Sequence, residues 1–283
     1  MSKNFSKDKY KNYNFKENRS KMIFKNKSIG LTLSGGGTKG VAHAGVLAYL
    51  DELEIKPNMI SCTSAGSIAA CLYAWGYAPQ EILRFVQTID IFKWKYFTLR
   101  KAGFIDSYSF KTIFDDIFKE HKIGELNIAV NICATDMVRQ RIKIFDPETK
   151  IVDAILASCA FPGVLSPYKI KGNIYSDGGI LNHFPTDTIQ GRCDFLIGSY
   201  VSPLQKIDNT YLNSIKNIMT YSLDLMQHQL NQSKFAYCDI LIQPEELATY
   251  STFETNKKIM QEIYAIGYQT AKIEFEKLDP LNL

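Results

Sequence analysis

Two successive strand–turn–helix units near the beginning of the chain place the strongest constraint on its fold. In the first, the alternating segment Ser28–Leu33 leads through the glycine-rich loop Ser34–Gly40 into a helical apolar pattern over Val41–Leu53. In the second, the apolar pair Met59-Ile60 leads through small residues into a helical pattern over Ile68–Trp75. Consecutive units of this kind predict a parallel sheet in which both turns lie at the same edge.

The second turn has the form of a nucleophile elbow. Thr63-Ser64-Ala65-Gly66-Ser67 places Ser64 at the centre of the G-x-S-x-G pattern, where a tight turn holds a hydroxyl at the positive end of a helix. Cys62 stands where the first glycine of the pattern belongs. Taken alone, the stretch fits an ordinary strand–helix junction equally well, so the choice depends on the rest of the chain.

The glycine-rich loop predicts an anion site, because free backbone N–H groups converge where a helix begins. Gly35-x-Gly37-x-x-Gly40 also fits the dinucleotide fingerprint, which requires an acidic residue about 20 positions further on. The second strand ends instead in Cys62-Thr63-Ser64, and the phosphate motif G-x-x-x-x-G-K-[ST] is absent. Nucleotide binding is therefore disfavoured. We expect instead that the backbone N–H groups of this loop stabilise an oxyanion formed beside Ser64.

The remainder of the chain continues the alternation of strands and helices. Apolar patterns predict strands at 127–135, 139–145, 168–170, 173–176, 195–201 and 239–242, and helices at 79–89, 107–119, 151–158, 215–230 and 255–277. This order predicts an α/β fold of three layers, α/β/α, with a central, mostly parallel sheet.

The basic character of the chain is confined to its beginning. Residues 1–28 hold nine Lys/Arg against two acidic residues, whereas the rest carries a net charge of −3. We predict a flexible basic tail over 1–27 and a single folded domain over 28–283. Two alternatives for the tail are an electrostatic contact with anionic lipid and a contact with nucleic acid. We favour the flexible tail and expect no nucleic-acid partner.

Composition also limits the cellular compartment and the kinds of binding site that we expect. The six cysteines form no C-x-x-C pair and no cluster with histidine, which indicates a reducing compartment and no metal site. No signal peptide is recognised, and the longest uncharged run, 59–80, holds too many Ser, Thr, Gly and Pro residues for a membrane span. We therefore expect a cytoplasmic protein without cofactor or metal.

Residues 90–104 interleave aromatic and basic side chains without a helix or strand period. They fit either a cap that packs its aromatic rings on the core or a lid or surface that meets acyl chains and anionic headgroups. The second interpretation predicts peripheral contact with a membrane.

Asp177 is the candidate for the base that a serine nucleophile needs. It stands between a short predicted strand and Gly178-Gly179, which presents its carboxylate at a strand end within reach of Ser64. Direct contact would make Asp177 the general base, a task that favours a raised pKa. A Ser-Asp-His order through His183 or His228 is the alternative from the residues alone.

Four blocks together resemble the patatin-like phospholipases. They are Gly35–Gly40, Thr63–Ser67, Ala157–Pro162 and Asp177–Gly179, in matching order and spacing. The resemblance implies hydrolysis of lipid acyl esters, as by a phospholipase A, lysophospholipase or carboxylesterase, through an acyl-serine intermediate. It implies a Ser64–Asp177 dyad without histidine or metal. It also implies an oxyanion hole from the backbone of Gly35, Gly36, Gly37, Thr38 and Lys39, with Gly40, Gly66, Gly178 and Gly179 as supporting motif glycines.

Two positions depart from the pattern of the family. Cys62 replaces a glycine at a place that requires a small residue, so we expect a tolerated elbow with added strain. His183 stands where the family more often has asparagine. Cys62 and the basic tail motivate an alternative function, a catalytically weak module of the same fold that binds lipid or a protein partner.

Overall fold

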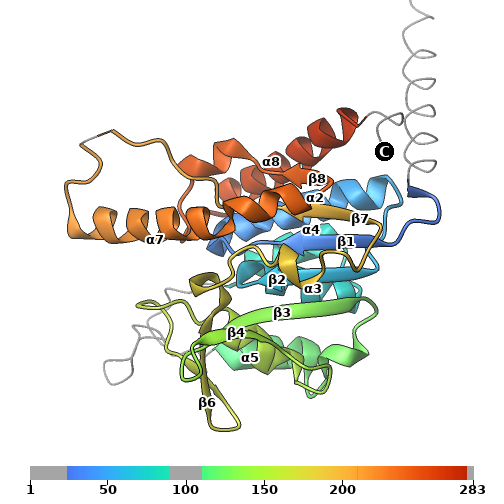
Figure 1. Cartoon of the computed structure of the whole chain (residues 1–283), viewed down its shortest axis with the longest axis horizontal. Helices are drawn as coiled ribbons and strands as arrows, with labels where there is room; N and C mark the ends of the chain where they lie inside the picture. Colours follow the sequence, from blue (N-terminus) through green and yellow to red (C-terminus); the bar gives the residue numbers. More distant parts are fainter. Residues whose placement is uncertain (1–23, 90–109, 209, 279–283) are drawn as a thin grey trace, which may run out of the picture.

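The computed structural model describes residues 24–89, 110–208 and 210–278. Strands and helices alternate around a central sheet, and the mostly parallel α/β/α architecture predicted from the sequence is confirmed (Figure 1). The aromatic and basic segment 90–104 and the tail before residue 24 lie outside the described residues. Of the predicted tail over 1–27, the structure describes residues 24–27. In this part Phe24 is buried against the rings of Phe195 and Phe275.

The sheet has the strand order β5-β6-β3-β2-β1-β7-β8, and β4 pairs with β3 beside this path. Strands β1, β2, β3, β7 and β8 run parallel, whereas β4, β5 and β6 are antiparallel to their partners. The parallel strands are β1 Ile29–Leu33, β2 Met59–Thr63, β3 Ala129–Asp136, β7 Phe195–Ser199 and β8 Ile240–Ile242. The antiparallel strands are β4 Arg141–Ile144, β5 Tyr168–Ile170 and β6 Asn173–Asp177.

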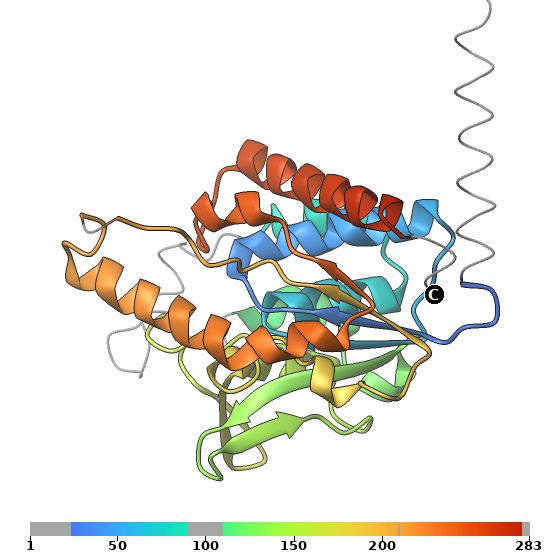
Figure 2. The same cartoon turned by 45° about the horizontal axis from the view of Figure 1, so that its top comes forward.

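Helices lie along the sheet and connect its strands (Figures 1 and 2). They are α2 Val41–Glu52, α3 Ala65–Trp75, α4 Pro79–Val86, α5 Lys111–Phe118, α6 Ile151–Ser158, α7 Ile215–Asn231 and α8 Lys257–Glu276. Helix α3 begins three residues before its predicted start, because Ala65, Gly66 and Ser67 carry no apolar pattern that would reveal the first turn. None of the described helices is both long enough and apolar enough to cross a bilayer.

One face of the sheet is covered at its centre by a segment with little regular structure. This segment, 178–193, contains the short 3-10 helices η5 Gly178–Ile180 and η6 Thr186–Thr188. Two strand hydroxyls anchor it: Ser61 Oγ donates to the carbonyl oxygen of Pro185 at 2.9 Å, and Thr63 Oγ1 donates to that of Asn182 at 2.8 Å. After β6 the chain therefore turns back and passes over β2.

Helices α2 and α8 approach each other closely because glycines lie at their contact. A Cβ atom at Gly45 would collide with the carbonyl oxygen of Tyr264, and a Cβ atom at Gly267 would collide with that of Ala42. Helix α2 continues directly from the glycine-rich loop. The packing of α8 therefore supports the end of the loop through α2.

Substituting Gly267 with alanine should lower the free energy of unfolding by about 1–3 kcal/mol, the usual cost of overpacking. An open helical glycine would behave in the opposite way, because alanine stabilises a helix by about 1 kcal/mol relative to glycine. Chemical denaturation measures the difference, and Ala265→Gly, at an exposed position of the same helix, reports helix propensity alone. A Gly267→Ala variant more stable than the wild type would contradict the close approach.

Candidate active site

The register of β2, β3 and β6 brings the two predicted catalytic residues together. Thr63 of β2 lies opposite Cys133 of β3, and Asp177 of β6 lies opposite Ala134, the next residue of β3. Ser64 directly follows Thr63, so it emerges beside the end of β6. There the Ser64 Oγ donates a hydrogen bond of 2.6 Å to Oδ2 of Asp177.

Ser64 holds a backbone conformation that residues with a side chain rarely adopt, with φ 52° and ψ −124°. Such strain persists only where surrounding contacts determine it. The Ser64 amide donates to Oγ of Ser158 at 2.8 Å, and that hydroxyl donates to the Cys133 carbonyl at 2.6 Å. Ser67 donates from its amide and its hydroxyl to the Ser64 carbonyl. The elbow is therefore held from both sides.

Ser158 is a residue of the site to which sequence reasoning assigns no role. It belongs to the Ala157–Pro162 block, but the turn that it supports lies 94 residues away in the chain. A buried hydroxyl with a distant backbone partner leaves no local sequence signal. The block could therefore be recognised, but the function of its serine could not.

Cys62 is fully buried beneath the elbow, and its thiol lies 3.5 Å from the carbonyl oxygen of Asn131. Burial raises the pKa of this thiol well above its usual range, and the neighbouring thiols of Cys71, Cys133 and Cys159 add to the shift. The side chain is therefore neutral. The elbow accommodates its Cβ and sulfur with the serine–aspartate hydrogen bond formed beside them.

Asp177 is buried, with 2% of its surface exposed. Burial raises its pKa to about 6, while hydrogen bonds from Ser64 and from the Gly179 amide oppose the shift. The Gly179 amide donates to Oδ1 at 2.7 Å, and Thr135 Oγ1 donates to the backbone carbonyl of Asp177 at 2.9 Å. A carboxyl group with this pKa is ionised at neutral pH and is a stronger base than an ordinary aspartate.

The supporting motif glycines all lie where a side chain would meet a neighbour. A Cβ atom would come within 2.9 Å of another atom at each of Gly40, Gly66, Gly178 and Gly179. At Gly40 that neighbour is the Cβ of Ala65, directly after Ser64. The glycine-rich loop and the elbow therefore pack together without an intervening side chain.

Three of the five predicted oxyanion donors already have backbone acceptors. The amides of Gly35, Thr38 and Lys39 donate to carbonyl oxygens at 3.0, 2.8 and 3.2 Å. The amides of Gly36 and Gly37 have no hydrogen-bond acceptor among the residues that the structure describes. Gly37 also has a φ of 56°, a conformation that favours glycine. These two amides are the candidates for binding an oxyanion.

The far end of the chain braces the glycine-rich loop. Thr38 donates from its amide to the carbonyl oxygen of Thr252 and from its hydroxyl, at 3.0 Å, to that of Glu254. Lys39, next in the loop, is buried, and the loss of hydration lowers its pKa, while the carboxylate of Asp224 opposes the shift. The loop therefore carries a buried lysine side chain that is poorly solvated.

Neither histidine of the alternative Ser-Asp-His order forms a hydrogen bond with Ser64 or Asp177 among the described residues. The ring of His183 lies between Gly35 and Gly179, and its two buried nitrogens have no hydrogen-bond partner among the described residues. Burial lowers the pKa of His183 to about 3, so the ring is neutral. His228, on α7, packs near the rings of Tyr200 and Phe235.

His43 is a second residue that sequence reasoning leaves without a role. Its Nδ1 lies 2.8 Å from Oγ of Ser199, and its Nε2 lies 2.9 Å from the carbonyl oxygen of Ser34. Burial lowers its pKa to about 4, so the ring is neutral. The carbonyl requires the proton on Nε2, and Nδ1 then accepts from the serine hydroxyl. His43 thus connects the ends of β1 and β7 where the glycine-rich loop begins.

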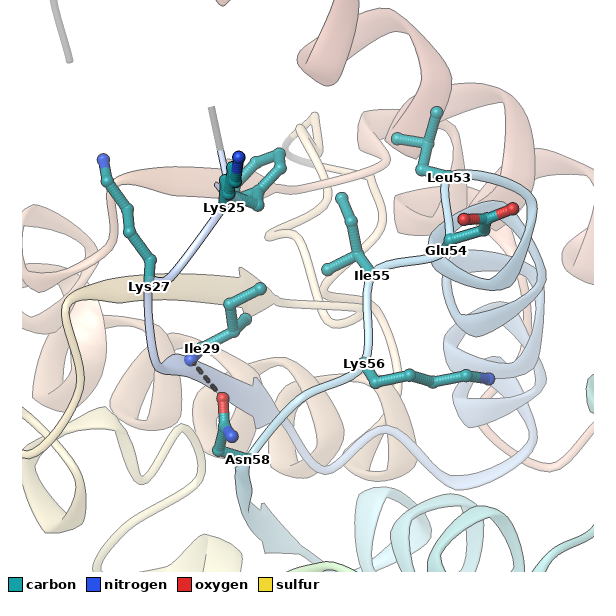
Figure 3. A pocket seen from close by; sticks show the side chains of 9 residues that line it. Lys25, Lys27, Ile29, Leu53, Glu54, Ile55, Lys56 and Asn58 are labelled. Carbon is teal, nitrogen blue, oxygen red and sulfur yellow. Dashed lines mark hydrogen bonds between the residues drawn. The ribbon is translucent and has the colours of Figure 1, made fainter. Parts of the chain in front are cut away.

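A separate cleft of about 350 Å³ lies where β1 and β2 begin, at the edge of the sheet opposite the dyad. Figure 3 shows its lining, which includes Lys25, Lys27 and Lys56, and the hydrogen bond from the Ile29 amide to Asn58. None of the predicted site residues lines it. Nowhere in the described part of the chain do three or more His, Cys, Asp or Glu side chains form a group suited to a metal ion.

Comparison with known proteins adds independent support for the family. Residues 31–189 match the family model of the patatin-like phospholipases. Uncharacterized protein R571 of Acanthamoeba polyphaga mimivirus is 26% identical over 288 residues, which cover 91% of this chain and 97% of R571. Lysophospholipase NTE1 of Debaryomyces hansenii is 29% identical over 170 residues, which cover 58% of this chain but only 11% of NTE1.

A solved structure has a similar fold. VipD from Legionella pneumophila superposes with a TM-score of 0.59 at 15% identity, covering 88% of this chain and 66% of VipD. At that identity the likeness concerns the fold alone. The match to the family model covers more than half of the 283 residues and includes both Ser64 and Asp177. The chain therefore belongs to the patatin-like phospholipase family, a family of lipid hydrolases.

Proposed function

We propose that this protein is a serine acyl hydrolase that cleaves acyl-ester bonds of phospholipids or related lipids. The observation that carries the proposal is the 2.6 Å hydrogen bond from Ser64 Oγ to the buried carboxylate of Asp177. Membership of the family supports a lipid acyl chain as the substrate. The relative NTE1, by its name a lysophospholipase, agrees with this substrate class.

In the first half-reaction, Asp177 accepts the proton of the Ser64 hydroxyl as Oγ attacks the ester carbonyl carbon. The carbonyl oxygen becomes an oxyanion, for which the amides of Gly36 and Gly37 are the proposed donors. Losing one such donor typically costs about 3–4 kcal/mol of transition-state stabilisation. The protonated Asp177 then returns the proton to the departing alcohol, and the acyl group stays on Ser64.

In the second half-reaction, Asp177 removes a proton from a water molecule, which attacks the acyl-serine carbonyl. The same amides stabilise the second oxyanion. The C–O bond to Ser64 breaks, the fatty acid leaves, and Ser64 Oγ takes back the proton from Asp177. The carboxylate of Asp177 thus acts as base in both halves and needs no intervening imidazole.

A fluorophosphonate probe should label the wild-type protein, and Ser64→Ala should abolish labelling and ester hydrolysis because the attacking oxygen is removed. Gel fluorescence and a p-nitrophenyl ester assay measure the two effects, and circular dichroism confirms the fold. Ser251→Ala, at an exposed serine, is the matched control and should keep both. Unchanged labelling of Ser64→Ala would refute the proposal. Lysophospholipids and diacyl phospholipids then define the preferred substrate.

The rate of hydrolysis should rise with pH through about 6, because Asp177 acts as a base only when it is deprotonated and its pKa is raised to about 6. The measurement is kcat/KM for a soluble ester across pH 4.5 to 8, in the range where circular dichroism shows no unfolding. An acidic limb centred near pH 4, the usual range of aspartate, would contradict the role of burial.

Asp177→Asn should lower kcat by about 100- to 10,000-fold, the usual contribution of a general base. His183→Asn should leave kcat within a few-fold of the wild type, because the His183 ring forms no hydrogen bond with either reacting group and the asparagine keeps a polar side chain. Steady-state kinetics on a soluble ester compare the two variants. A loss in His183→Asn as large as that in Asp177→Asn, in a folded protein, would overturn the dyad.

A further inference from the structure

Helix α7 turns an apolar face away from the protein. Six of its large apolar side chains are between 41% and 79% exposed and recur at spacings of three and four residues, which places them along one side of the helix. We call this set the α7 stripe: Ile215, Ile218, Met219, Leu223, Met226 and Leu230.

The opposite side of α7 is polar and contacts the candidate active site. Gln227 Nε2 donates to the carbonyl oxygen of Gly179 at 3.2 Å, and Asn231 Oδ1 accepts from the amide of Phe184 at 3.0 Å. The carboxylate of Asp224 interacts electrostatically with Lys39 of the glycine-rich loop. The polar side of the helix therefore contacts the segment that follows Asp177 and lies near the glycine-rich loop.

This orientation is the reverse of the usual one. An amphipathic helix on a globular protein normally buries its apolar side and exposes its polar side. Between residues 215 and 230, every described side chain is at least partly exposed. Figures 1 and 2 show α7 on the outside of the fold, with its first turns projecting beyond the sheet. An apolar stripe in this position lacks a partner within the described protein.

We propose that the α7 stripe is the surface with which the protein docks on a zwitterionic phospholipid bilayer, lying at the boundary between headgroups and acyl chains. The inference rests on the proposed function, since the polar side of the same helix contacts the loop that follows Asp177. A bilayer that meets the stripe brings acyl esters to the edge of the site. Helices lie in such interfaces with their apolar side inward and their polar side outward.

The size of the stripe favours a bilayer over a second copy of this chain. A helix of 17 residues is about 26 Å long, and a stripe about 10 Å wide along it covers roughly 260 Å². A stable protein interface buries about 800 Å² on each partner. A planar lipid surface needs no matching partner shape, because it accommodates apolar side chains individually.

The chemistry of the stripe favours zwitterionic lipid. The positions that lie between its members are Ser222 and Gln229, so the stripe itself contains no charged residue. Binding therefore depends on the burial of apolar surface and should persist at high salt. A contact made by basic residues with anionic lipid would behave in the opposite way.

The test uses Ser64→Ala protein and phosphatidylcholine vesicles, so that binding is measured without turnover. The double variant Met219→Asp/Met226→Asp should partition at least about tenfold less to the vesicles, because both carboxylates must stay hydrated. Ile273→Asp on α8, at a position 52% exposed, is the matched control and should partition like the parent. Sedimentation at about 0.1 M and about 1 M NaCl measures binding and its dependence on salt.

Three results would overturn the proposal. One is parent protein that does not bind phosphatidylcholine, and another is a double variant that binds like its parent. The third is a stable dimer of the wild type that dissociates in the double variant, seen by light scattering, which would assign the stripe to self-association. Circular dichroism confirms that both variants are folded.

Activity separates this proposal from the proposed function. In the Ser64-containing protein, the ratio of vesicle hydrolysis to short-ester hydrolysis should fall at least about tenfold in the double variant and stay constant in Ile273→Asp. Vesicle binding without hydrolysis of any ester would contradict the proposed function alone. Short-ester hydrolysis without vesicle binding would contradict the docking surface alone.

Discussion

The contact between Ser64 and Asp177 depends on β3, a strand that carries neither residue. The first half of β3 pairs in parallel with β2, and its second half pairs antiparallel with β6. The proposed nucleophile therefore comes from a parallel strand–helix unit and the proposed base from an antiparallel strand. Their separation is determined by backbone hydrogen bonds, and a register slip of one residue would turn one of the side chains to the other face of the sheet.

Burial shifts the pKa values of the titratable side chains at the site. Asp177 is held with a raised pKa, whereas His43 and His183 are neutral because their pKa values are lowered. Burial also lowers the pKa of Lys39 in the glycine-rich loop. In such a poorly solvated environment, backbone dipoles directed at a developing negative charge are worth more than they would be in water. This suits a reaction whose intermediates are oxyanions.

Much of this arrangement could be predicted from the sequence, because strands, helices and tight turns leave local patterns. The two strand–turn–helix units and the alternation of strands and helices that follows them were sufficient to predict the α/β/α architecture. The support of Ser64 by Ser158 and the occupied amides of Gly35 and Thr38 could not be predicted, since they join distant segments through backbone groups. Helix α7 illustrates another limit, because the period of its apolar residues reveals two sides but not which side faces the protein.

The two hydrogen bonds from Thr38 to the segment before α8 show which parts of the chain the glycine-rich loop needs. The family model ends at residue 189, yet the glycine-rich loop near its start is held by the carbonyl groups of Thr252 and Glu254. A fragment cut to the recognisable region would retain Ser64, Asp177 and every motif glycine while losing this brace. The boundaries of sequence similarity are therefore not the boundaries of the folded unit, and an excised core would keep Ser64 and Asp177 without the contacts that hold the glycine-rich loop.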